Sequence, residues 1–508
     1  MKIKLSSLLA LVLLTTCLAN TSIAQFDSQK IKNIDKAIPV VDNLYKEYAE
    51  KNHLPGLIYG LVVDGKLIHT ANIGYSDLAK KKLVNAESDF HIASMTKSFT
   101  AMAILKLRDE GKLKLDDPAH VYIPELKQQK YLTSEASPIT IRHLLTHAAG
   151  FPEDNPWGDR QLAITEQAML EMIKKGISFS NVPGVSYEYS NMGFAMLGYI
   201  IVKVSGQPYQ KYITNNILIP LGMTHTYWDY QDVPSHQLAQ GYRWLNDQWI
   251  EQPLLKSGAY GAMGGMISTM NDFSKYVALH LSAWPASEDK ETSLLKRSSL
   301  LEMQHGWNIS GLNSTYKYPN GRFCPIVTAY GYGLRWLEDC ENRRMIGHSG
   351  GLPGFGSDWK ILPDYGIGII CFSNHTYAPA SLLNMQALDT LIALAKLQPK
   401  SLPVSTILKQ RKSELIKLLP DWNKAELSGI FAENFFLDYF PDVLRKEASA
   451  VFNKAGKIVR IHELVASNNL RGSFIMEGEK ADIEIFFTLT PENPPLIQQY
   501  SIKEKLKK

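Results

Sequence analysis

Residues 89–99 read DFHIASMTKSF, a short run typical of a strand followed by the start of an apolar helix. Ser94 and Lys97 are three positions apart, and residues at this spacing lie on the same face of a helix. The lysine amine can therefore reach the serine hydroxyl and activate it as a nucleophile. A serine at the start of a helix also has its backbone N–H among unpaired amides, which favour negative charge. The stretch thus predicts a catalytic serine and its lysine partner.

The Ser-x-x-Lys spacing is a weak signal by itself, because the chain contains it five times. The pairs are Ser94/Lys97, Ser287/Lys290, Ser293/Lys296, Ser314/Lys317 and Ser357/Lys360. Only the first pair follows a strand-like run and opens an apolar helix, which we predict over residues 94–110. The next two lie in a charged segment typical of a loop, the fourth in a polar segment, and the fifth at the start of a strand. We therefore assign the nucleophile to Ser94.

A second candidate motif, Tyr189-Ser190-Asn191, stands just before an apolar helix predicted over residues 191–204. A tyrosine can transfer protons if neighbouring cations lower the pKa of its hydroxyl. An asparagine offers both a donor and an acceptor to a substrate amide. The same three residues also fit a helix cap, with Ser190 or Asn191 as the capping residue.

The third motif is His348-Ser349-Gly350, followed by Gly351. It lies between stretches predicted as strands, so we expect an edge strand that lines a cleft. Small residues there let a substrate backbone approach and pair with the strand. A rival Lys-Ser-Gly stretch at 256–258 precedes a glycine-rich segment rather than a strand, and we prefer the motif that contains His348.

Strand-like runs are found near both ends of the first 400 residues, and helix-like runs lie between them. The early strands are predicted over 56–63 and 66–73, after a helix over 25–55. The late strands are predicted over 332–337, 343–346, 357–362 and 366–372. This order favours one antiparallel sheet assembled from both chain ends, with a helical region inserted between them. The fold class is therefore α/β in the mixed, α+β sense.

A second domain is predicted after a linker over residues 398–404, which contains two prolines and a serine. Residues 405–508 read as one or two helices followed by four strands, a small α+β unit large enough to fold alone. We find no catalytic constellation in it, and its role in substrate gating, dimerisation or cell-wall binding stays open. The main domain then spans residues 25–397.

Residues 1–24 are predicted to be a secretory signal peptide. Two lysines precede an apolar run over 5–14, and residues 22–24 are of the type read by a signal peptidase, so the mature chain starts at Gln25. The apolar run is too short for a membrane span. A lipid anchor at Cys17 is not expected, because the threonine before it fits such a site poorly. We therefore predict a periplasmic or secreted protein.

Composition excludes several other classes of protein. The 508 residues include 54 basic and 50 acidic side chains, so the net charge is +4, too small for a nucleic-acid-binding surface. No Cys-x-x-Cys or His-Glu-x-x-His motif is present, and we predict no metal or other cofactor. Cys324 and Cys340 flank a strand-like stretch and can pair across a hairpin, whereas Cys371 lies in an apolar run and is predicted to be a core thiol.

The order Ser-x-x-Lys, Tyr-x-Asn, His-x-Gly resembles the serine β-lactamase and penicillin-binding-protein superfamily, specifically its class C-like branch. The resemblance covers about residues 35–395 and implies the β-lactamase/transpeptidase-like fold, an antiparallel sheet flanked by helices. Four further stretches carry it: 141–151 (IRHLLTHAAGF), 220–223 (PLGM), 264–272 (GGMISTMND) and 332–334 (YGL).

The resemblance implies that Ser94 is acylated and that Lys97 and Tyr189 share the proton transfer, with the identity of the base left open. It further implies a substrate and oxyanion site formed by Asn191, His348, Ser349, Gly350 and Gly351. In that site Asn191 orients the substrate amide, and the N–H groups of Ser94 and Gly351 form the oxyanion hole.

The implied activity is an acyl-enzyme serine hydrolase acting on D-amino-acid peptides, like a D-Ala-D-Ala carboxypeptidase, or on esters. Its partners are then small molecules or peptides, including cell-wall peptides. A class C β-lactamase is a further alternative, although many β-lactamases carry a lysine where this chain has His348. A non-catalytic penicillin-binding-like receptor is the alternative from another class. Seven aromatic residues either line an apolar substrate pocket or anchor loops: Trp157, Trp228, Tyr230, Tyr242, Trp244, Trp249 and Tyr260.

Overall fold

The computed structural model describes residues 6–285 and 294–505, and the chain divides into two compact units between Pro399 and Lys400. This division falls within the stretch expected to be a linker. Ser287, Lys290 and Ser293, which belong to two of the alternative Ser-x-x-Lys pairs, lie outside the described residues. In the described ranges no helix is both long enough and apolar enough to cross a membrane.

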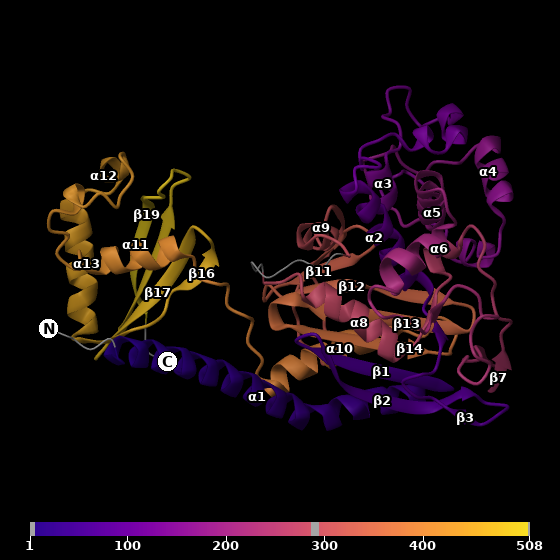
Figure 1. Ribbon diagram of the computed structural model, residues 1–508, viewed down its shortest axis with the longest axis horizontal. Helices are drawn as coiled ribbons and strands as arrows, with labels where there is room; N and C mark the ends of the chain where they lie inside the picture. The colour runs from indigo at the N-terminus through magenta and orange to yellow at the C-terminus, as the bar shows by residue number, and fades with distance from the viewer. Residues whose placement is uncertain (1–5, 286–293, 506–508) are drawn as a thin grey trace. The chain divides into compact units, whose positions relative to one another are not determined.

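The first unit is built on a nine-stranded antiparallel sheet with the strand order β3-β2-β1-β14-β13-β12-β11-β10-β9 (Figure 1). Its strands are β1 (Gly56–Val63), β2 (Lys66–Asp77), β3 (Lys82–Leu83), β9 (Asn308–Asn313), β10 (Ile326–Tyr330), β11 (Arg335–Asp339), β12 (Arg344–Leu352), β13 (Phe355–Leu362) and β14 (Ile367–Ser373). Shorter strands outside it are β4 (Phe90–His91), β5 (Thr226–Tyr227), β6 (Tyr242–Leu245), β7 (Gln248–Glu251) and β8 (Ile267–Ser268). The β1–β14 pairing joins the two ends of the unit, as the sequence predicts.

Helices cover both faces of this sheet (Figure 1). One face carries α1 (Ser6–Lys51) and α10 (Ala380–Ala395), and the other carries α8 (Met270–Leu281) and the inserted helical region. That region includes α2 (Thr96–Asp109), α3 (Ile141–Leu145), α4 (Glu166–Lys175), α5 (Asn191–Ser205), α6 (Tyr209–Ile213) and α7 (Gly261–Gly264), and α9 (Arg297–Met303) follows α8. The fold class is therefore confirmed as mixed helix and antiparallel sheet.

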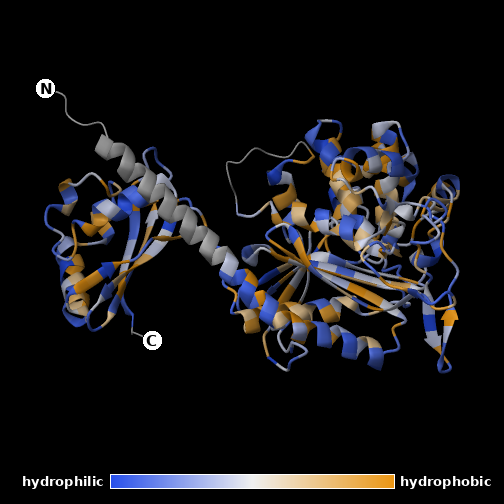
Figure 2. Ribbon diagram, turned by 60° about the horizontal axis from the view of Figure 1, so that its bottom comes forward, coloured by the Kyte–Doolittle hydropathy of each residue, from blue (hydrophilic) through white to orange (hydrophobic). Residues whose placement is uncertain are grey.

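The sheet positions the rest of the unit because its central strands are buried on both faces. Every residue of β1 and β14 is buried, and apolar residues gather on these strands and on the helices that cover them (Figure 2). On α1, the residues Ile34, Ala37, Val41 and Tyr45 recur every three or four positions and face the sheet side. This spacing matches a helix that buries one stripe.

Some element boundaries differ from the prediction. The first helix begins at Ser6 rather than near residue 25. The strand expected over 332–337 begins only at Arg335, because Gly333 has a φ of +67° and the chain turns there against α2. A Cβ on Gly333 would lie 2.7 Å from the Lys97 carbonyl oxygen, so this close approach needs glycine. Cys324 and Cys340 form a disulfide, and Cys371 is a buried free thiol.

The second unit contains a five-stranded antiparallel sheet of β15 (Ile458–Ile461), β16 (Val465–Asn468), β17 (Arg471–Gly478), β18 (Asp482–Leu489) and β19 (Ile497–Lys505). Its helices are α11 (Thr406–Ile416), α12 (Phe435–Asp438) and α13 (Pro441–Ala455). Burial alternates along β17 and β18, which is the pattern of a sheet with one face on a core. Trp422, Phe474 and Ile485 belong to that core.

Candidate active site

Ser94 lies in a short 3₁₀ turn (η1, Ala93–Met95) that leads directly into α2. Ala93, the residue before it, has a φ of +51°, a left-handed conformation that L-residues rarely adopt. The turn is held by the hydrogen bond from the Thr96 hydroxyl to the Ala93 carbonyl. Ser94 is 7% exposed, so its hydroxyl meets solvent only through the cavity described below. The predicted position of the serine at the helix start is therefore found.

Lys97 is fully buried one turn along, and its amine is surrounded by three oxygen atoms. Its Nζ lies 3.0 Å from Ser94 Oγ, 2.7 Å from Asn191 Oδ1 and 2.9 Å from the carbonyl oxygen of Met263 in α7. Burial lowers the pKa of Lys97 to about 7, against the opposite effect of the nearby carboxylates of Asp159 and Asp154. A neutral amine has two protons and one lone pair. The two carbonyl oxygens accept the protons, which leaves the lone pair for the Ser94 hydroxyl.

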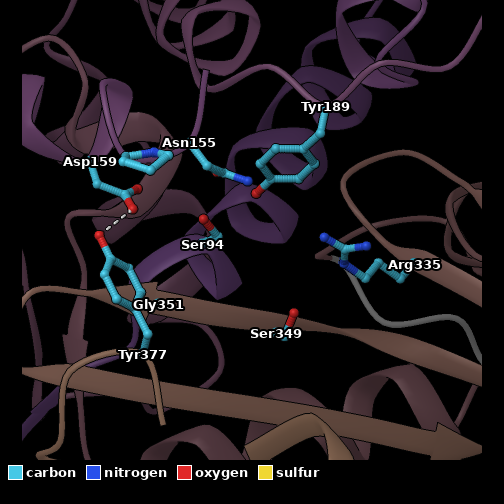
Figure 3. A pocket seen from close by; sticks show the side chains of 9 residues that line it. Ser94, Asn155, Asp159, Tyr189, Arg335, Ser349, Gly351 and Tyr377 are labelled. Atoms are coloured by element: carbon cyan, nitrogen blue, oxygen red, sulfur yellow. Dashed lines mark hydrogen bonds between the residues drawn. The ribbon is translucent and has the colours of Figure 1, made fainter. Parts of the chain in front are cut away.

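Tyr189 stands over the same amine, with its ring centroid 4.9 Å from Lys97 Nζ. Its hydroxyl is directed toward Ser94 (Figure 3). The expectation that cations make this phenol acidic is not met. Burial raises the pKa of Tyr189 far above its usual value, and this outweighs the lowering effects of Arg335 and of the hydrogen bond with Ser94. Lys97, not Tyr189, is therefore the group that loses its proton near neutral pH.

Asn191 opens α5 but does not reach the cavity, since it is completely buried. Its side-chain oxygen accepts from Lys97, and its Nδ2 donates to Asn155 Oδ1 at 3.1 Å. The oxygen and one N–H of the amide thus have partners within the protein, and the expected contact with a substrate amide stays a prediction. Ser190 is the cap of this helix and accepts from the Gly193 N–H, so the capping reading of the motif also holds.

The α5 N-terminus also binds a loop that the sequence analysis did not single out. The Asp154 carboxylate accepts hydrogen bonds from the backbone N–H groups of Asn191, at 2.6 Å, and Met192, at 2.8 Å. A carboxylate is favoured there by the unpaired amides of the helix. Gly158 then approaches Asn191 so closely that a Cβ would lie 2.8 Å from the Asn191 Cβ. The loop over 154–159 is therefore fixed against the catalytic elements.

The His348 motif forms the end of β12, which is an interior strand of the sheet rather than an edge strand. Its pairing with β11 stops at Gly347, while its pairing with β13 continues to Leu352. The segment after Gly347 is therefore unpaired on its β11 side and acts locally as an edge. Ser349 and Gly351 line the cavity there, and Gly350 packs against the Ile92 carbonyl beneath Ser94.

His348 itself is buried and neutral, and it does not line the cavity. Its Nδ1 lies 2.6 Å from the Ser349 carbonyl and must donate, so its Nε2 accepts from the Tyr330 hydroxyl at 2.8 Å. Burial lowers the pKa of His348 well below its usual range, and the cations Arg335 and Lys97 lower it further. The charge that a lysine would supply at this position is absent.

A cavity of about 300 Å³ lies above Ser94 (Figure 3). It is lined by Ser94, Asn155, Pro156, Asp159, Tyr189, Arg335, Ser349, Gly351 and Tyr377. The predicted residues Ser94, Tyr189, Ser349 and Gly351 are thus brought together around one space. Lys97, Asn191 and His348 lie behind them as a buried layer, and Gly350, which is partly exposed, packs against the Ile92 carbonyl.

Sequence reasoning missed Asn155, Asp159, Arg335 and Tyr377, which come from loops or from a strand end. No fixed spacing connects them to the motifs, and two of the four are uncharged, so no sequence signal singles them out. The aromatic residues considered as pocket lining do not line the cavity; Tyr260, for example, is buried beside Trp157. The rival Ser257 donates to the Gly265 carbonyl and also lies outside the cavity lining. In the described residues no group of three or more His, Cys, Asp or Glu side chains could hold a metal ion.

Fold and site together define a protein of the serine β-lactamase and penicillin-binding-protein type. The family model described as "Beta-lactamase" matches residues 41–393. The chain therefore belongs to the β-lactamase family.

Three relatives show how this family is represented. Protein flp of Staphylococcus aureus strain N315 is 30% identical over 384 residues, which is 74% of this chain and 70% of that protein. The strain COL protein is 30% identical over 67% of this chain, and the match spans less than two thirds of that protein, 64%. Beta-lactamase-like protein 2 of Dictyostelium discoideum is 30% identical over 52% of this chain and 49% of its own length.

The fold is also that of a solved structure, the octameric penicillin-binding protein homologue from Pyrococcus abyssi. The two superimpose with a TM-score of 0.59 over 93% of this chain and 96% of that one, at 23% sequence identity.

The close packing of Gly350 under Ser94 gives a testable prediction about stability. A Cβ at Gly350 would lie 2.3 Å from the Ile92 carbonyl oxygen, so Gly350→Ala forces the turn and β12 apart. We expect a loss of about 1–3 kcal/mol in the free energy of unfolding, measured by urea denaturation. Gly311→Ala on the same sheet is the control, because its Cβ meets only Thr328 Oγ1 at 3.6 Å. Equal midpoints for the two variants would contradict the packing argument.

Proposed function

We propose that this chain is an exported serine hydrolase that forms an acyl-enzyme on Ser94 and cleaves peptides at a C-terminal D-amino acid. The observation that carries the proposal is the buried Lys97 amine, 3.0 Å from Ser94 Oγ, whose pKa burial lowers to about 7. A general base works best when its pKa lies near the operating pH. Export rests on the predicted signal peptide, and cell-wall peptides are the natural substrates of this kind outside the cytoplasm.

The chemistry follows from the positions of these groups. Lys97 accepts the Ser94 proton while Ser94 Oγ forms a bond to the substrate carbonyl carbon. The carbon–nitrogen bond then breaks, and the proton passes to the leaving amine. The Tyr189 hydroxyl lies beside Ser94 and can relay this proton. Water attacks the resulting ester, which releases the acid and restores the Ser94 hydroxyl. Both half-reactions need the same base, and the buried amine can serve in each.

The oxyanion of the tetrahedral intermediate needs donors that are already in place. The N–H of Ser94 belongs to the η1 turn, and Gly351 lies on the unpaired side of β12 facing the same cavity. We assign the oxyanion hole to these two amides. Glycine at 351 also leaves room for the Tyr377 ring, which a Cβ would approach to 2.7 Å.

Arg335 favours substrates with a free carboxylate. It lines the cavity, its side chain is exposed, and its guanidinium forms no hydrogen bond or ion pair with another described residue. Its nearest ring is that of Tyr189, with 5.3 Å between the guanidinium carbon and the ring centroid. An arginine binds a carboxylate through two parallel hydrogen bonds. Since His348 is neutral, Arg335 is the cation that meets the carboxylate of a C-terminal residue.

The same cation also suits the carboxylate of a β-lactam, which makes slow acylation by penicillins the second candidate activity. Neutral esters gain nothing from Arg335 and rank lower. Burying an ionisable amine costs stability. A receptor without catalysis would gain nothing from an amine buried beside the serine that offsets this cost.

The first prediction concerns covalent chemistry at Ser94. The full chain is incubated with benzylpenicillin, and its intact mass is measured over time by mass spectrometry. We expect the mass to increase by that of one penicillin. Ser94→Ala should gain nothing, and Ser314→Ala, another Ser-x-x-Lys serine, should behave as the wild type. Penicillin that stays intact and unbound with all three proteins would contradict acylation at this site. Penicillin consumed by the wild type without a lasting adduct would favour the β-lactamase alternative.

The second prediction concerns pH. Lys97 must be neutral to accept a proton, so kcat/KM should rise with pH and level off above about 7. Lys97→Ala should lower kcat/KM by about a hundredfold to ten-thousandfold, whereas Lys106→Ala on the same helix should have little effect. Tyr189→Phe should lower the rate but keep the midpoint, because the phenol does not ionise in this range. A midpoint that moves or disappears in Tyr189→Phe would return the base to tyrosine.

The third prediction concerns the carboxylate. Arg335→Gln should lower kcat/KM for N-acetyl-D-Ala-D-Ala by about tenfold to a hundredfold, the range for losing a charged hydrogen bond. The C-terminal amide of the same peptide serves as the internal reference, and its kcat/KM should change much less. Arg344→Gln, which removes an arginine that pairs with Asp364 in the turn between β13 and β14, is the matched control variant. Equal losses for acid and amide would show that Arg335 does not bind the carboxylate.

A further inference from the structure

The cavity carries a second isolated charge, and it is negative. Asp159 lines the cavity, and its residue is only 4% exposed. Its carboxylate accepts a hydrogen bond from the Tyr377 hydroxyl at 3.0 Å. Within residues 6–285 and 294–505 it forms no ion pair. Asp159 and Tyr377 lie on one side of Ser94, and Arg335 lies on the other (Figure 3).

We propose that Asp159 binds the ammonium group of the substrate, so that the preferred substrates are dipeptides with a free amino terminus and a free carboxylate. The inference rests on the proposed function and narrows its substrate class. With the scissile carbonyl at Ser94 and the carboxylate at Arg335, the acyl part of the substrate extends toward Asp159. A cavity of about 300 Å³ is at the small end for ligand sites and suits a ligand of this size.

The position of Asp159 is fixed, which a binding group requires. Asp154 ties the start of its loop to the N-terminus of α5, and Gly158 packs on Asn191. The Tyr377 hydroxyl, from the segment after β14, donates a hydrogen bond to the carboxylate. Thus neither the loop nor the carboxylate has to move when a ligand enters.

A buried carboxylate without a cation is costly, so its function must account for the cost. Balancing the charge of Lys97 is one possible account. However, the Lys97 amine directly contacts a hydroxyl and two carbonyl oxygens rather than a carboxylate. Burial raises the pKa of Asp159, whereas the charge of Lys97, the Tyr377 hydroxyl and the charge of Arg160 lower it. When the Lys97 amine is neutral, as a base must be, no cation among the described residues forms an ion pair with this carboxyl group. A substrate ammonium in the cavity would supply the missing cation.

The test compares D-Ala-D-Ala with N-acetyl-D-Ala-D-Ala, measured as released D-alanine for the full chain. The quantity is the ratio of kcat/KM for the free dipeptide to that for the acetylated one. We expect the wild type to prefer the free dipeptide and Asp159→Asn to lower the ratio by about tenfold or more. The ratio cancels any general effect of Asp159 on Lys97, because both substrates use the same base.

Two further variants separate charge from position. Glu153→Gln removes an exposed carboxylate just before the loop that carries Asp159, keeps an oxygen that can accept from Asn155, and should leave the ratio unchanged. Tyr377→Phe removes the hydrogen bond but keeps the charge, so the ratio should fall less than in Asp159→Asn. An unchanged ratio in Asp159→Asn, or a wild type that prefers the acetylated peptide, overturns the inference while the serine hydrolase stands. If neither peptide is cleaved but penicillin acylates Ser94, the dipeptide inference fails together with the peptide substrate, while the acyl-enzyme on Ser94 stands. If Ser94 is never acylated, the whole proposed function fails.

Discussion

The site depends on one constraint, the burial of a lysine amine at the bottom of the cavity. An ammonium ion is expensive to remove from water, so burial favours its neutral form. The three oxygens around Lys97 Nζ then decide the orientation of the neutral amine. Its two N–H groups donate hydrogen bonds to the two carbonyl oxygens, and its lone pair faces the Ser94 hydroxyl. Asn191 supplies one of these carbonyl oxygens, and this contact explains why a residue of the predicted substrate site is completely buried. The hydroxyl and the base are thus aligned before any substrate binds.

Packing supports that alignment from three sides. In the turn at Ser94, Ala93 has a left-handed backbone conformation. Gly350 of β12 packs against this turn, and it can do so because it has no side chain. The glycine turn at Gly333 lies against the Lys97 carbonyl, and α7 supplies the Met263 oxygen. These segments are far apart in the sequence. They meet because the nine-stranded sheet joins both ends of the unit and the helical region covers one of its faces.

The charged groups of the cavity follow a different logic from the catalytic groups. Burial and the nearby cations Arg335 and Lys97 lower the pKa of His348 and keep it neutral, so the positive charge of the cavity comes from Arg335 at the start of β11. The negative charge comes from Asp159, at the end of a loop held by the α5 N-terminus. The catalytic layer lies on regular elements and their ends, whereas the charges that can select a substrate lie on a loop and a strand end. Loops on a rigid scaffold are the usual location of such residues.

The sequence by itself determined the sheet built from both chain ends, the start of α2 at Ser94 and the three motifs. Those features depend on local periodicity and on spacings of a few residues, which a sequence displays directly. The tertiary structure alone decided that burial raises the pKa of the Tyr189 hydroxyl, that Asn191 faces Lys97 and that β12 is an interior strand with an open end. It also decided that Asp159 and Arg335 flank Ser94. Burial and long-range contacts set these properties, and neither can be read from the order of residues along the chain.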